Sequence, residues 1–248
     1  LWYSTGNSAF YTDLKNNYLG EGTLHSRYIR GATGGKPFTL GKYEGTRIRA
    51  AIGELIANGG APMGFYTRYT DPNARKVITQ YYNFIRQHDR IYRYNQPAAE
   101  SVLLFPRQAV HAGNVAAVQK FLKLGDELLN QHILFDILPD DLATEDALNN
   151  YKNIYRVDNS KPAASARFKI TAPKTTRASL SRPAKGDALH LHFVNYNRTE
   201  PKNARSAGGG IHDEKPIAVK GIHCSMALPE GKKIKNIKFF TPEKSIAM

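Results

Sequence analysis

A helical period of hydrophobic residues marks three long segments of the chain. The first lies at 46–57, between a threonine that can cap a helix and a terminating Asn-Gly-Gly. The second begins at Asp71-Pro72, an N-cap residue followed by proline at the first helical position. The third lies at about 115–130, where apolar residues follow one face. A shorter helix is expected around 19–29.

Short apolar or alternating runs between these helices predict strands. They lie at 1–7, 37–43, 61–66, 101–105, 132–138 and 151–157, with an acidic short helix at 139–148 and a loop at 106–114. Because strands and helices alternate along the chain, residues up to about 158 are expected to form parallel α/β structure. The polar stretch "RYNQPAAE" at 93–100 interrupts the pattern and divides it into two units.

Beyond residue 158 the helical period is lost. The stretch "ALHLHFVNYN" at 188–197 alternates strictly and predicts a strand, while "NSKPAASARFKITAPKTTRA" at 159–178 predicts a linker or a hairpin. Two further strands are expected, "IAVKGIHCSMAL" at 217–228 and "KIKNIKFFTP" at 233–242, after a polar loop that contains three glycines. This pattern predicts a small antiparallel β domain.

Charge distinguishes the two parts of the chain. The net charge is +14, and residues 151–248 hold +12 of it, with 19 Lys/Arg against 7 Asp/Glu. Such an imbalance favours a polyanionic partner such as RNA, an acidic glycan or an anionic assembly surface, although a solvated basic face would look the same. The apolar runs are too short to cross a membrane, and no signal peptide is visible. The chain begins with leucine and not with methionine, and this suggests that it is processed or is part of a longer chain.

The single cysteine limits the chemistry available. Cys224 excludes an internal disulfide and any multi-cysteine metal site, and it is expected to be a small buried hydrophobe. His190 and His192 share one face of a predicted strand and could bind a metal, but further ligands are not evident, so a cross-strand polar pair is the alternative. His111 follows a strand in a position that can bind ligands. The sequence predicts neither a metal nor a cofactor.

Four stretches in a fixed order resemble one enzyme family. They are "KPFTLGKYEGTRIRAAIGELIANGGAPMGFYTRY", "SVLLFPRQAVHAGN", "LGDELLNQHILFDILPDD" and "LHLHFVNYNRTEPK". They resemble the C-terminal half of bacterial β-galactosidase-like glycoside hydrolases, relatives of glycoside hydrolase family 42, over about residues 1–240. In that family a TIM barrel is followed by a flavodoxin-like trimerisation domain and a small β domain.

The resemblance implies a fold class of α/β plus β in three parts. Residues 1–95 would be a partial TIM-barrel-like segment with the last two strand/helix units, the strands being 37–43 and 61–66. Residues 98–158 would form a shortened flavodoxin-like unit, and 160–248 a basic, antiparallel β-sandwich-like domain. A homo-oligomer, or association with the missing N-terminal half of the barrel, would follow.

The resemblance also places the candidate site. Lys42 occupies the position expected for the catalytic nucleophile, which in the family is a glutamate. Because lysine cannot carry out that displacement, Glu44 is the candidate catalytic residue, with an ion pair to Lys42 or a helix N-terminal charge as the alternative. Tyr43, Tyr66 and Arg68, at the ends of the same two strands, are the candidate substrate-binding residues.

Three functions remain open on the sequence. The first is a carbohydrate-active protein with a glycan ligand or substrate, in which this chain is not catalytic alone because the family's acid/base carboxylate is missing. The alternative is a glycosidase-derived structural subunit whose basic C-terminal domain contacts RNA or another polyanion. The third is a non-catalytic carbohydrate-binding protein.

Overall fold

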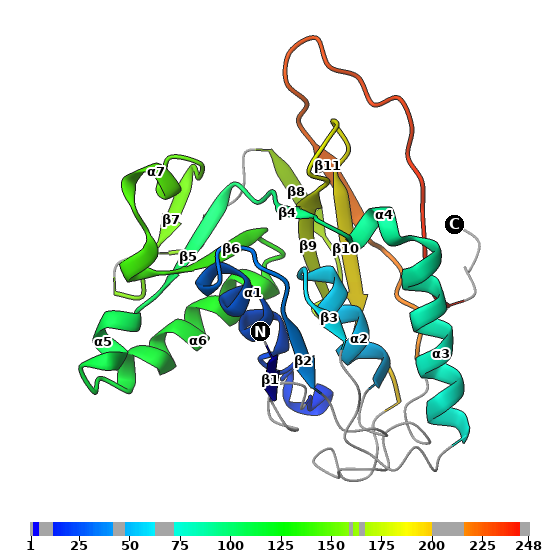
Figure 1. The fold of residues 1–248 in the computed structure, drawn as a ribbon, viewed down its shortest axis with the longest axis horizontal. Coiled ribbons are helices and arrows are strands. Elements are labelled where there is room, and N and C mark those ends of the chain that lie inside the picture. Colours follow the sequence, from blue (N-terminus) through cyan, green and yellow to red (C-terminus); the bar gives the residue numbers. More distant parts are fainter. Residues whose placement is uncertain are drawn as a thin grey trace.

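The computed structural model describes residues 2–4, 12–41, 48–62, 72–158, 161–163, 167–199 and 216–243. Parallel strands with intervening helices occupy the N-terminal part, and antiparallel strands follow (Figure 1). The expected class, α/β plus β, is therefore confirmed in this general form. Within the described residues the strands form four small sheets and no closed barrel.

The first sheet is parallel and runs in chain order. It contains β1 (Trp2–Ser4), β2 (Thr39–Gly41) and β3 (Ala61–Pro62). The helices α1 (Gly22–Ala32), α2 (Ile48–Ala57) and α3 (Pro72–Gln87) follow these strands in turn, with η1 (Leu14–Asn16) before α1 and α4 (Asp89–Tyr92) after α3. The expected strands and helices are confirmed where they fall on described residues, and β1 adds a third parallel strand beside them.

Apolar residues at the predicted spacings hold this unit together. Phe38 and Leu40 pack with Ile29, Ala51 and Leu55, so the sheet is covered by α1 and α2. The other face of α2 packs on α3. Helix α2 ends where the sequence predicts, because Gly59 has a φ of 84° and the Gly60 N–H donates to the Leu55 carbonyl.

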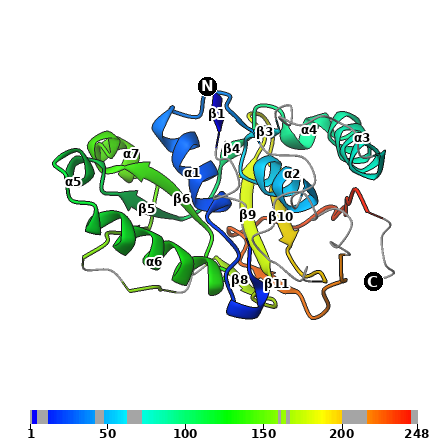
Figure 2. The ribbon, with the colours of Figure 1, turned by 90° about the horizontal axis from the view of Figure 1, so that it is seen from below.

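The second sheet is also parallel, in the order β6-β5-β7. It contains β5 (Ser101–Phe105), β6 (Phe135–Pro139) and β7 (Asn153–Tyr155), and its helices are α5 (Arg107–His111), α6 (Ala116–Asn130) and α7 (Glu145–Leu148), with η2 (Asp140–Leu142). Helix α1 also packs on β6 (Figure 2), because Leu24 belongs to the core formed by α6 and this sheet.

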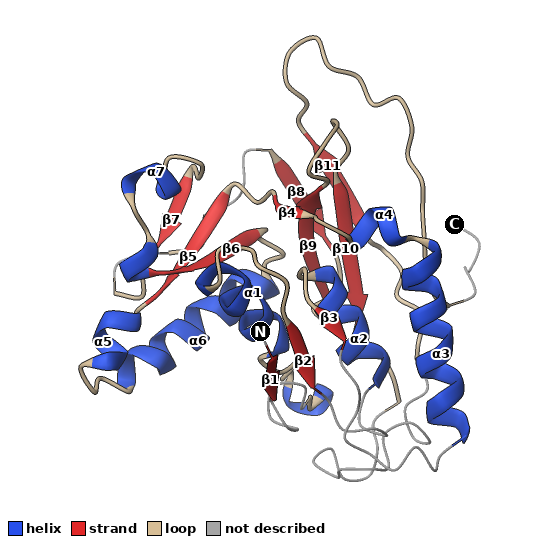
Figure 3. Ribbon diagram, in the orientation of Figure 1, coloured by secondary structure: helices blue, strands red, loops and turns tan. Residues whose placement is uncertain are grey.

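Two antiparallel sheets complete the fold (Figure 3). One has the order β10-β9-β4, from β10 (His190–Asn195), β9 (Thr176–Arg182) and β4 (Gln96–Pro97), and the other pairs β11 (His223–Met226) with β8 (Phe168–Thr171). Their apolar faces share a core that includes Phe168, Ile170 and Leu180. The stretch 93–100 is thus more than an interruption, because it supplies β4.

Four expectations about local structure are wrong. Residues 233–242 form no strand, since no described strand pairs with them, and their apolar side chains are largely exposed. The strand expected at 217–228 shortens to His223–Met226, and the loop at 106–114 contains α5. Cys224 is exposed, because β11 pairs with β8 alone and leaves this side chain uncovered.

Across the described segments, no helix has both the length and the apolar composition needed to cross a membrane.

Candidate functional site

An open cleft with a volume of about 2810 Å³ runs beside the β10-β9-β4 sheet. Its walls come from α1, α2, α3, β6 and this sheet, and from residues 229–243. We call residues 229–243 the C-terminal strap. The strap returns toward α3 as the red segment of Figure 1.

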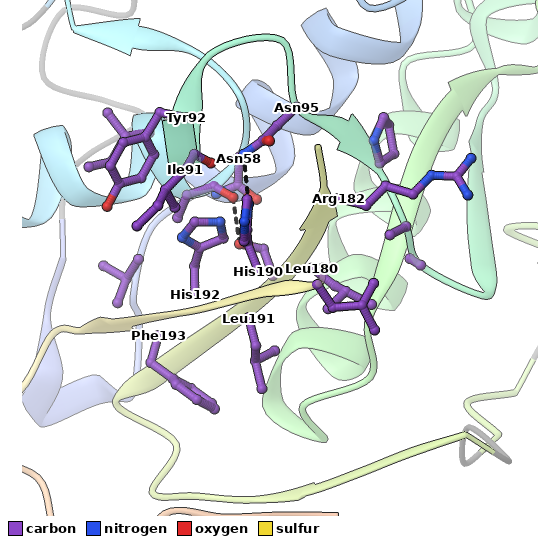
Figure 4. Close-up of a pocket in the computed structure, with 18 of the residues that line it drawn as sticks. Asn58, Ile91, Tyr92, Asn95, Leu180, Arg182, His190, Leu191, His192 and Phe193 are labelled. Atoms are coloured by element: carbon purple, nitrogen blue, oxygen red, sulfur yellow. Dashed lines mark hydrogen bonds between the residues drawn. The ribbon is translucent and has the colours of Figure 1, made fainter. Parts of the chain in front are cut away.

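Four polar residues of the cleft wall, Tyr92, Asn95, His190 and His192, gather beside the buried Ser181, and we call these five residues the imidazole corner. His190 and His192 lie on the same face of β10 because side chains alternate along a strand. His192 Nε2 lies 3.2 Å from Ser181 Oγ on the neighbouring strand, and Asn95 Nδ2 lies 3.3 Å from both Ser181 Oγ and His190 Nδ1. Figure 4 shows both imidazoles beside Asn95 and Tyr92.

Both imidazoles are held neutral. Burial lowers the pKa of His192 to about 4, and the positive charge of Arg30, together with that of His190 whenever His190 is protonated, acts in the same direction. Burial also lowers the pKa of His190, although a hydrogen bond to the Ile91 carbonyl opposes this shift. At pH 7 each ring therefore offers one N–H donor and one acceptor, the combination that a hydroxyl group can satisfy.

The geometry favours binding over nucleophilic catalysis. Ser181 and His192 resemble a nucleophile and its base, but such pairs need a third group that orients the imidazole. Within the described segments no carboxylate makes a hydrogen bond or an ion pair with His192. The corner is therefore better suited to hold a hydroxylated ligand than to attack one.

We expect His192 to titrate near pH 4 in the folded protein, as measured by NMR of its ring protons. Between about pH 6.5 and 4 the unfolded chain then binds a proton that the folded chain does not, so acidification destabilises the fold. The variant His192→Gln should lose less stability between pH 7 and pH 5 than the parent chain, by up to about 2 kcal/mol in urea unfolding. A His192 pKa near 6.5, with parallel stability profiles, would contradict this result.

Arg30 links the imidazole corner to a carboxylate on β6. Its Nη2 donates to the Asn95 carbonyl at 2.6 Å. Burial raises the pKa of Asp136 to about 6, although the positive charges of Arg30 and Arg27 oppose the shift. Tyr151 Oη donates to Asp136 Oδ2 at 3.3 Å. Asp136 is thus a cleft carboxyl group whose charge changes close to neutral pH.

Arg27 fixes the base of the cleft. Its Nε donates to Asn58 Oδ1 at 2.9 Å, its Nη2 donates to the Ala178 carbonyl at 2.8 Å, and its guanidinium carbon lies 4.6 Å from the centre of the Phe135 ring. Burial lowers its pKa to about 10, so it stays charged at neutral pH. Arg27 therefore joins α1 to Asn58 at the end of α2, to Ala178 in β9 and to Phe135 in β6.

The structure does not test the site implied by the family resemblance. Glu44, Lys42, Tyr43, Tyr66 and Arg68 all lie outside the described residues. They remain predictions.

The histidine hypotheses can be compared with the structure. The cross-strand polar pair is confirmed for His192, which contacts Ser181. In the part of the chain that the structure describes, no three His, Cys, Asp or Glu residues are grouped so that they could hold a metal ion. His111 is exposed in α5 and does not line the cleft.

Several residues at the site were not predicted from the sequence: Arg27, Arg30, Tyr92, Asn95 and Asp136, which line the cleft, and Ser181, which contacts Asn95 and His192. One signal was visible, because the β9 sequence "TRASLSR" alternates polar and apolar residues. Its polar positions Arg177, Ser179 and Ser181 are all buried in the structure. Asn95 carried no comparable signal, since its contact with Ser181 joins positions far apart in the chain.

No family model matches the chain, and neither a curated protein nor a solved structure is significantly similar to it.

Proposed function

We propose that this chain is a carbohydrate-active protein related to β-galactosidase-like glycoside hydrolases, and that on its own it binds a glycan without hydrolysing it. The order of its elements carries the proposal. Three adjacent parallel strands, each followed by a helix, precede a small parallel sheet and then antiparallel strands. This is the order that the resemblance implies.

The proposal assigns each part a counterpart in that family. Residues 1–95 correspond to the last units of a TIM-barrel-like segment, with β1 as one strand more than the two that the resemblance implies. Residues 98–158 correspond to a shortened flavodoxin-like unit and 160–248 to a β-sandwich-like domain. The flavodoxin-like unit is also the region through which we expect copies of the chain to associate.

The described carboxylates of the cleft support binding without hydrolysis. Retaining hydrolysis needs two carboxyl groups about 5–5.5 Å apart, one of them free to attack. Three acidic residues of the cleft are instead paired with bases: Glu100 with Lys152, Asp187 with Lys232, and Glu243 with Arg49. The position expected for the nucleophile is Lys42, so Glu44 is the remaining candidate.

A glycan array and a hydrolysis assay with the whole chain test this proposal. We expect saturable binding to at least one glycan, and no release of nitrophenol from nitrophenyl β-galactoside above the buffer rate. The absence of binding to any glycan would refute the proposal. Hydrolysis that Glu44→Gln abolishes would instead show that the chain is an active enzyme.

A second candidate is the structural subunit that contacts RNA or another polyanion. It is favoured by the net charge of +12 on residues 151–248 and by the exposed lysines of the C-terminal strap. This function predicts RNA binding that weakens steeply as salt is raised. RNA binding that is absent at 50 mM salt would exclude it.

A further inference from the structure

We propose that the cleft binds an acidic polysaccharide, with the C-terminal strap contacting its anionic groups and the imidazole corner its hydroxyls. This inference rests on the proposed glycan-binding function and adds the location of the site and the class of ligand.

The C-terminal strap contacts the rest of the chain near both of its ends. Near its end, Gln80 Nε2 donates to the Pro242 carbonyl at 2.5 Å, and Glu243 accepts a hydrogen bond from Tyr81 Oη at 3.0 Å. The Phe240 ring lies 4.7 Å from the ring of His88. Near its start, Lys232 Nζ lies 3.9 Å from Asp187 Oδ2. The strap is thus held as one wall of the cleft.

Between these anchors the strap exposes cations beside apolar side chains. Lys233, Lys235 and Lys238 are exposed and line the cleft, and they make no ion pair with any described residue. Ile237 is 64% exposed and Phe239 is 71% exposed. Lysines next to an exposed ring can contact an anionic sugar through both its charge and the apolar face of its ring.

The charge of the cleft supports an anionic ligand. Among the described residues, eleven lysines and arginines line the cleft against four acidic residues. Three of these acids already have basic partners, and Asp136 lies near Arg27 and Arg30. Basic side chains thus outnumber acidic ones among the described residues of the cleft, and an anionic polymer would complement this excess.

The imidazole corner favours a glycan over RNA as the ligand. His190 and His192 are neutral imidazoles; one nitrogen of each, His190 Nδ1 and His192 Nε2, contacts a side chain of the corner, and the other nitrogen can pair with a sugar hydroxyl. Phosphate oxygens are acceptors only, and sequence-tolerant RNA binding relies on rows of exposed aromatic rings. Tyr94 and Phe239 are exposed in the cleft and could stack with bases, so poly(U) is the competing ligand in the test.

Titration of the whole chain with four fluorescent ligands of equal length tests the inference. These are an oligogalacturonate, a heparin oligosaccharide, a neutral galactan and poly(U). The strap variant Lys233→Gln/Lys235→Gln/Lys238→Gln is compared with Lys76→Gln/Lys123→Gln/Lys174→Gln, which removes the same charge from exposed positions outside the cleft. His190→Ala tests the contribution of the imidazole corner to binding.

We expect one or both acidic glycans to bind more tightly than the neutral galactan and poly(U). The two acidic ligands distinguish carboxylate from sulfate recognition. The strap variant should lose about tenfold in affinity at 50 mM salt and show a shallower salt dependence, while the control stays within about twofold. His190→Ala should weaken binding of the acidic and the neutral glycan alike.

Other outcomes would overturn the ligand class, the location of the site or the proposed function. Equal binding of neutral and acidic glycans would overturn this inference but leave the proposed function in place. Equal losses in the strap variant and its control, or no effect of His190→Ala, would place the site elsewhere. Tighter binding of poly(U) would favour the RNA-contacting subunit. Failure of every glycan to bind would refute the proposed function as well.

Discussion

Gly31→Ala is expected to destabilise the chain by about 3 kcal/mol, because α1 crosses β6 too closely for a side chain. A Cβ atom at this position would lie 1.9 Å from the Ile137 carbonyl oxygen. This oxygen belongs to the backbone of β6, so it cannot move aside as a flexible side chain could. Urea unfolding followed by circular dichroism measures the change.

Gly53→Ala is the matched control. It also places alanine within a helix, but its Cβ atom would lie 3.7 Å from Val194 Cγ1, an ordinary van der Waals distance. We expect this variant to be neutral or more stable by up to about 1 kcal/mol, since alanine favours helices more than glycine does. Equal effects of the two substitutions would mean that α1 does not pack on β6 as described.

Arg27→Met should destabilise the fold by about 3–5 kcal/mol, as expected when one partner of a buried polar network is removed. Methionine can retain the contact with Phe135, but it leaves Asn58 Oδ1 and the Ala178 carbonyl without their donor. Loss of this positive charge should also raise the pKa of Asp136 further. Urea unfolding and NMR of the carboxyl carbon measure the two effects.

Arg93→Met is the corresponding control on the surface. Arg93 Nε lies 2.9 Å from Asp89 Oδ1, and both side chains are exposed. Exposed pairs of this kind contribute less than about 1 kcal/mol. If Arg27→Met were as mild as Arg93→Met, Arg27 would not be the structural link between α1 and β9.

Local patterns predicted the elements that depend on local sequence. The strand at 101–105 has the predicted bounds, and the helix expected at about 115–130 spans Ala116–Asn130. Both segments have a clear hydrophobic pattern and clear ends, so local spacing was sufficient. The same reasoning located α2 and its terminating glycines.

Elements that depend on distant partners were not predictable in this way. Residues 233–242 have strand-like composition, but a strand needs a neighbour, and none of the described strands lies beside them. Conversely, Gln96–Pro97 looks like a linker and becomes β4 because β9 lies next to it. The packing of α1 on β6 is equally non-local, and Gly31 showed no sign of it in the sequence.

The same distinction between local pattern and distant contacts applies to the residues of the candidate site. Strand alternation placed His190 and His192 on one face and anticipated a cross-strand partner, which is Ser181. Asn95 and Arg30 join them only through the tertiary fold. Local patterns therefore identified the imidazoles, but not the cleft that surrounds them.

NMR of the eight histidines during titration with an oligogalacturonate shows whether a glycan binds at the imidazole corner. We expect saturable shifts of the ring signals of His190 and His192, with His111 unchanged because it lies outside the cleft. The signals would be assigned by single His→Gln variants. Saturable binding that leaves both His190 and His192 unshifted, or the absence of binding, would contradict the account.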